Sequence, residues 1–241
     1  MSEKLSAQRS VPTLVVAIVA MFAPAMAVAQ PSASAPVELR REQLCVTNGE
    51  VTSRPGGHLA VETPSSRGVA RLATPQEAEI RFHYLGPTRD SKPLASGELR
   101  RQIGLKLRAQ DTCNLVYVMW HIEPDSRIAV SVKRNPGQHT HEQCDAKGYL
   151  NVRPRKTIPL AKVLEGETHE LHATLTGAEL CVEADRKTVW EGQLEPHSLD
   201  FEGPAGFRTD NARFEFEFLV SPGGGSPVDQ RLNPCVTSAG D

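Results

Sequence analysis

Three consecutive segments carry the side chains best suited to chemistry. Segments 102–108 and 127–133 alternate apolar and polar residues, and 115–122 is apolar on both faces apart from two polar residues. Successive side chains of a strand point to opposite faces, so if Ile103 and the residues in phase with it face a core, the other face is largely basic. That face displays Gln102, Lys106, Arg108, Tyr117, His121, Arg127 and Lys133.

A basic face of this kind is suited to an acidic polysaccharide. Guanidinium and ammonium groups pair with carboxylate and sulfate groups, and a tyrosine and a histidine would add hydrogen bonds. The alternative explanation is a solvated outer face whose charges keep the protein soluble. The sequence leaves both explanations open.

Metal and nucleotide chemistry have weaker support. His139 and His141, beside Glu142, could begin a metal site, but no third ligand is identifiable and no Cys-x-x-Cys pair is present. Asp210 and Asn211 could offer oxygens to calcium, although both are also common turn residues. We therefore expect no metal and no cofactor. The sequence contains no Gly-x-Ser-x-Gly, no phosphate-binding glycine loop and no His-Glu-x-x-His.

Short strands are predicted to position these residues. Apolar side chains alternate in segments spread over the chain, and glycine and proline separate these segments. The remaining predicted strands are 43–46, 58–62, 69–72, 79–84, 169–175, 180–184, 189–190 and 213–218. The stretch 135–161 lacks alternation and is expected to be a long loop region, and 158–165 is the best candidate for a short helix. The fold class is therefore all-β, with two antiparallel sheets forming a sandwich.

The N-terminus indicates export. Lys4 and Arg9 precede an apolar run over 11–28, and Ala27-Val28-Ala29 is typical of a signal-peptide cleavage site. An uncleaved anchor is the alternative, but Pro24 interrupts a run that is short for a bilayer span. We divide the chain into a signal peptide (1–29), a flexible leader (30–40), the β-sandwich (41–220) and a flexible tail (221–241). The mature chain is expected to have no membrane span and to be secreted or periplasmic.

The charge of the chain limits its possible partners, and its cysteine content predicts disulfides. Lys plus Arg number 27 and Asp plus Glu 29, so net charge gives no argument for a nucleic-acid partner. Five cysteines in an exported chain favour two disulfides and one leftover thiol. We favour Cys45–Cys235, which would join the ends of the domain, and Cys113–Cys144; spacing alone does not fix the connectivity.

The closing part of the chain resembles concanavalin A-like lectin/glucanase domains, including laminin-G-like modules. The resemblance lies in His-Glu-Leu-His-Ala-Thr-Leu at 169–175, in Leu-Cys-Val-Glu-Ala-Asp at 180–185 with Val189-Trp190 after it, and in Gly-Pro-Ala-Gly-Phe-Arg-Thr-Asp-Asn-Ala-Arg-Phe-Glu-Phe at 203–216. The resemblance extends back to about residue 79. It implies a jelly-roll sandwich, often with sugar bound on the concave face or at its rim.

The resemblance does not imply catalysis. Retaining glucanases of this fold carry a Glu-x-Asp-x-(x)-Glu strand, whereas Glu215 and Glu217 here have no Asp between them. Some polysaccharide lyases share the fold, and Arg108, His121 and Tyr117 could neutralise the substrate, remove a proton and protonate the leaving oxygen. Those lyases place Gln-x-His on one strand, and here Gln102 is followed by Ile-Gly.

Three hypotheses follow for the function. The leading one is an exported module without catalytic activity that binds a polysaccharide or glycoconjugate, an anionic one in particular, through the predicted basic face. The others are a polysaccharide-degrading lyase or hydrolase and an envelope protein-interaction domain, and fold alone does not choose among them. The chain has only two tryptophans, Trp120, expected in the core, and Trp190, expected to be partly exposed. This scarcity counts against an aromatic sugar platform.

Overall fold

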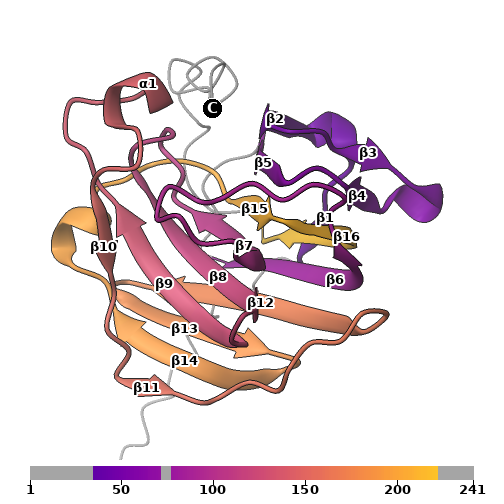
Figure 1. The fold of residues 1–241 in the computed structure, drawn as a ribbon. Helices are drawn as coiled ribbons and strands as arrows, with labels where there is room; N and C mark the ends of the chain where they lie inside the picture. Colours follow the sequence, from indigo (N-terminus) through magenta and orange to yellow (C-terminus); the bar gives the residue numbers. More distant parts are fainter. Residues whose placement is uncertain (1–34, 72–76, 222–241) are drawn as a thin grey trace, which may run out of the picture. The chain divides into compact units, whose positions relative to one another are not determined.

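The computed structural model describes residues 35–71 and 77–221. The described residues form an all-β sandwich, with 51% of them in strands and 7% in helix, so the predicted fold class is confirmed (Figure 1). The predicted signal peptide, residues 30–34 of the predicted leader and residues 222–241 of the predicted tail lie outside the described residues. Within the described part of the chain, no helix is long and apolar enough to cross a membrane.

One sheet has nine strands. Its order is β11 (Lys156–Thr157), β14 (Lys187–Gln193), β13 (Glu179–Ala184), β12 (Thr168–Thr176), β6 (Glu77–Pro87), β16 (Ala212–Val220), β4 (Leu59–Val61) and β3 (Thr52–Ser53), and β1 (Val37–Glu38) also pairs with β16. All its pairings are antiparallel. The segment 30–40 was expected to be a flexible leader. It contains β1, whose backbone pairs with Leu219 and Val220, so this part of the segment belongs to the sheet.

The other sheet has seven strands and carries the predicted polar face. Its order is β10 (Tyr149–Asn151), β9 (Arg127–Lys133), β8 (Leu115–Glu123), β7 (Arg101–Leu107), β15 (Gly206–Asp210), β5 (Ser65–Ala70) and β2 (Leu44–Asn48). β7, β8 and β9 lie side by side as a meander (Figure 1), as predicted from their alternation. The helical elements of the described residues are α1 (His141–Cys144) and the 3-10 turns Arg41–Gln43, Pro55–Gly57 and Pro196–Ser198.

The core lies between the two sheets. Ile103, Val116 and Ile128 are buried in it, so the predicted orientation of the meander is confirmed. Phe82 of β6 meets Trp120 of β8 edge to face, with ring centroids 5.5 Å apart, which joins the sheets across the core. The opposite face of the seven-stranded sheet is therefore free to carry polar residues.

Some local predictions are wrong. Residues 158–165 form no helix, and Trp190, expected to be partly exposed, is buried because it pairs with Val182 and Thr157 inside the sheet. β15 was not predicted as a strand of its own. Its insertion between β5 and β7 adds new side chains to the polar face.

The cysteines agree with the prediction where the structure describes them. Cys113 and Cys144 form a disulfide with Cα atoms 5.9 Å apart, and Cys181 is a free thiol. Cys235 lies outside the described residues, so its pairing with Cys45 stays a prediction.

Candidate functional site

A groove of about 1350 Å³ lies along the outer face of the seven-stranded sheet. Four of the predicted site residues line it, namely Gln102, Tyr117, His121 and Arg127. Sequence reasoning missed a further polar set that also lines it, which is Arg67, Lys92, Arg100, Tyr149, Arg208 and Asp210. The meander therefore supplies only part of this groove, and β5, β10, β15 and the loop before β7 supply the rest.

Arg208 is fixed at the base of the groove. It lies on the same face of β15 as Asp210, because the two are separated by one residue. Its Nε donates to Asp210 Oδ2 at 2.7 Å and its Nη2 to Oδ1 at 3.3 Å. Burial lowers the pKa of Arg208, but its neighbours Asp210, Tyr117 and Tyr149 together more than offset this effect, Asp210 most of all, so the pKa lies above its usual value. The guanidinium is permanently charged.

Asp210 holds Arg208 in place at the base of the groove. Its side chain is 2% exposed and accepts a third hydrogen bond, from Gln102 Nε2 at 2.5 Å. Gln102 Oε1 has no hydrogen-bond partner among the described residues. Asn211, next in the chain, exchanges hydrogen bonds with the backbone of Lys92 at 2.7 and 2.9 Å and so positions the loop that borders the groove. Both residues have structural partners, so the calcium alternative gains nothing from this geometry.

His121 is a neutral imidazole among arginines. An Nη1 hydrogen of Arg100 is donated to His121 Nε2 at 3.2 Å, and because guanidinium cannot accept, the imidazole proton is on Nδ1. Burial, followed by the charges of Arg100, Arg127 and Arg208, lowers the pKa of His121 to about 3. His121 therefore adds no positive charge to the groove at neutral pH.

An aromatic pair lies beside these charges. Tyr117 and Tyr149 are stacked with centroids 5.9 Å apart and planes inclined by 23°. Tyr149 is 41% exposed, and Lys133 Nζ lies 5.4 Å from the centroid of its ring. The groove thus has the exposed aromatic surface that the scarcity of tryptophan argued against.

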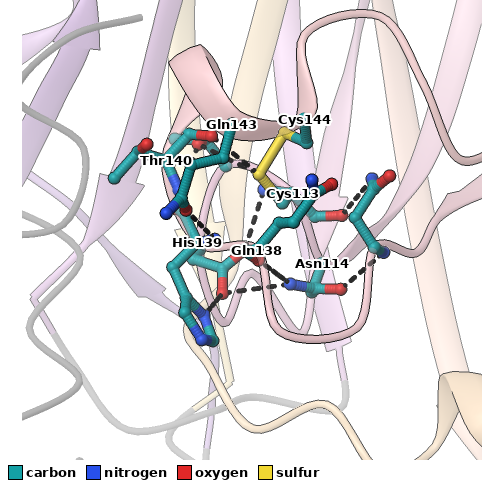
Figure 2. Close-up of polar contacts among 10 residues, drawn as sticks. Cys113, Asn114, Gln138, His139, Thr140, Gln143 and Cys144 are labelled. Atoms are coloured by element: carbon teal, nitrogen blue, oxygen red, sulfur yellow. Dashed lines mark hydrogen bonds and ion pairs between the residues drawn. A yellow bond between two sulfur atoms is a disulfide. The ribbon is translucent and has the colours of Figure 1, made fainter.

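The disulfide anchors the loop at one end of the groove. Figure 2 shows Cys113 joined to Cys144, and Asn114 bound through its side-chain amide to the carbonyl of Gln138 at 2.8 Å. His139 Nδ1 lies 2.8 Å from the buried carboxylate of Asp111. These contacts fix the stretch that leads to β10, and His139 serves to hold this loop in place.

Three residues of the predicted basic face, Lys106, Arg108 and Lys133, lie outside the lining of the groove. Arg108 follows the last residue of β7, so strand alternation no longer sets its direction. Its φ is 51°, and its guanidinium donates to the carbonyls of Phe201 and Leu199 at 2.7 and 2.5 Å. Lys106 lies on the groove side of β7 but is buried. Arg108 is placed to fasten the chain before β15.

Comparisons with known proteins identify the fold. No protein-family model and no curated protein sequence matches the chain. The carbohydrate-binding module CBM66 from Bacillus subtilis is 12% identical, with a TM-score of 0.51 over 72% of this chain and 91% of that chain. The carbohydrate recognition domain of Emp46p, in its metal-free form, is 9% identical with a TM-score of 0.49, covering 76% of this chain and 89% of that one. Crh5 transglycosylase in complex with NAG is 12% identical with a TM-score of 0.48, covering 85% and 92%. This chain has the concanavalin A-like lectin/glucanase jelly-roll fold.

Proposed function

We propose that this protein is an exported carbohydrate-binding module that holds an acidic glycan in the groove of the seven-stranded sheet. The observation that carries the proposal is a set of three cations in the groove lining. Arg67, Lys92 and Arg127 all line the groove, and none of them forms an ion pair within residues 35–71 and 77–221. Sugar binding is in keeping with the carbohydrate-binding module of the same fold.

The charges of the groove differ in what they can bind. Arg208 is neutralised by Asp210, and Arg100 pairs with Glu98, so these two guanidiniums chiefly shape the site. The unpaired cations are the groups available to carboxylate or sulfate, and charge-assisted hydrogen bonds of this kind are among the stronger ones. Because they are arginine and lysine, their charge persists throughout the neutral range of pH.

Tyr149 supplies the second kind of contact. The exposed face of its ring is apolar, and the C–H face of a pyranose ring can pack against such a surface. The ring is held by its stack on Tyr117, so little side-chain freedom is lost when a sugar binds. A groove that combines cations with a fixed aromatic face suits a charged sugar better than a neutral one.

The proposed site of action is outside the cytoplasm. The Cys113–Cys144 disulfide is of a kind that persists in oxidising compartments, which supports a secreted or periplasmic protein together with the signal peptide predicted over 1–29. Export would place the groove where polysaccharides and glycoconjugates are found.

A retention assay tests this proposal. Purified protein is run on columns carrying polygalacturonate, chondroitin sulfate or dextran, and the polysaccharides are assayed afterwards for new chain ends. We expect retention on the two acidic matrices, release by sodium chloride and no new chain ends. Equal retention on dextran would contradict the acidic preference, and new chain ends would favour the polysaccharide-degrading enzyme instead. Absence of retention on every matrix would favour the protein-interaction domain.

A further inference from the structure

The groove continues past its basic part into an apolar niche at the edge of the sandwich. The side chains that form this niche also line the groove. They are Ile128, Val130, Val152, Pro154, Ile158, Pro159 and Trp190. None of them carries a charge, whereas the neighbouring part of the same groove is lined by arginines.

The edge of β9 explains how the two parts meet. β10 pairs with β9 only at Ser131, Val132 and Lys133, and one more bond runs from Val152 N–H to the carbonyl of Val130 at 2.9 Å. Pro154 has no N–H, so it cannot extend the pairing. The chain then leaves this sheet and joins the other as β11, so no paired strand is described beside residues 127–129 on this side.

Strand alternation places charge and apolar surface on successive residues there. Arg127 points to the basic face and Ile128 to the space between the sheets, and one residue of strand spans about 3.3 Å. Across the opening, Ile158 is 44% exposed and sits next to Thr157, which pairs with Trp190. A ligand that lies over the edge of β9 would meet both surfaces at once.

We infer that the groove takes an acidic glycan bearing an aliphatic substituent, such as an acyl or alkyl chain. This inference rests on the proposed function, since the acidic groups would bind beside Arg127 while the aliphatic chain enters the niche. Burying the chain removes apolar surface from water both on the ligand and on Ile158, which favours binding. The cations beside the niche bind the acidic end of the ligand, which stays outside the niche. This charge complementarity fixes the orientation of the ligand in the groove.

The test compares two ligands that differ only in the chain. Binding of a galacturonic acid trisaccharide and of its octyl glycoside is measured by calorimetry. We expect the octyl glycoside to bind at least about tenfold more tightly, because several methylene groups are buried. In Ile158→Ser this ratio should fall toward one. Leu164→Ser is the matched control, because Leu164 is also an exposed apolar residue but does not line the groove, and it should keep the ratio.

The outcomes separate this inference from the proposed function. If the trisaccharide binds and the octyl group adds nothing, or if both serine variants lose the advantage equally, the niche does not take the chain and only this inference fails. If neither ligand binds, the proposed acidic-glycan function fails and the inference fails with it.

Discussion

The guanidinium of Arg208 lies over the ring of Tyr117, with its carbon atom 5.3 Å from the ring centroid. A cation in this position is attracted by the ring face, so the contact stabilises both side chains. Arg208 comes from β15 and Tyr117 from β8, and β7 lies between these strands. The base of the groove is therefore assembled by the pairing of distant segments, and its rigidity depends on the partners of Arg208.

Removing the carboxylate of Asp210 should destabilise the fold. Asp210→Ala leaves the Arg208 guanidinium without its ion-pair partner, although its side chain is only 12% exposed. We expect the free energy of unfolding to fall by about 3 kcal/mol, as when one partner of a buried pair is removed. Urea denaturation measures this loss. Asp200→Ala, at an exposed site, should change stability little; equal effects of the two substitutions would show that the pair is unimportant.

Stability should decline in acid because of His121. Its pKa is lowered to about 3 in the fold, whereas an unfolded histidine titrates near 6.5. Between these values the unfolded chain binds a proton that the folded chain does not, so this contribution is fully present above about pH 6.5 and is lost as the pH falls toward 3.

Denaturation at several pH values checks this expectation. The loss attributable to His121 should be roughly 1 kcal/mol per pH unit within that window. His121→Gln, which keeps an acceptor for Arg100, should make the decline shallower, while replacement of the exposed His197 by Gln should not. A variant with an unchanged acid profile would mean that His121 is protonated in the folded protein.

Part of the groove could be predicted from the sequence, and the missing part has physical causes. Gln102, Tyr117, His121 and Arg127 were found because their strands are long enough to show a period of two. Arg208 was missed because β15 has five residues that begin at a glycine, too few for a clear pattern. A strand of this kind is specified by pairing on both sides rather than by its own alternation.

Tyr149 shows the same limit at the other end of the groove. β10 has only three residues and is set by its pairing with β9 and by the disulfide that anchors the preceding loop. Arg108 shows the opposite error, because alternation was carried one residue past the end of β7. Long-range pairing and the exact ends of strands were the information that the sequence did not contain.

The Tyr149 ring should contribute to sugar binding as an apolar surface. Tyr149→Ala is expected to weaken retention on polygalacturonate by about tenfold, the order of magnitude for losing one aromatic contact. Tyr149→Phe keeps the ring and should retain nearly all the affinity. Retention by affinity electrophoresis measures both variants. If the phenylalanine variant is as weak as the alanine variant, the hydroxyl rather than the ring makes the contact.

The central claim is that the unpaired cations of the groove hold an acidic glycan. It is tested most directly by the migration of Arg67→Ala/Lys92→Ala/Arg127→Ala through gels that contain polygalacturonate or dextran, beside the unsubstituted protein. The control is Arg186→Asn, which removes a cation from an exposed turn where asparagine tolerates the positive φ. We predict that polygalacturonate retards the unsubstituted protein and the control but not the triple variant, although circular dichroism shows all three folded, and that dextran retards none. Equal retardation of the folded triple variant and the control by polygalacturonate would contradict the claim.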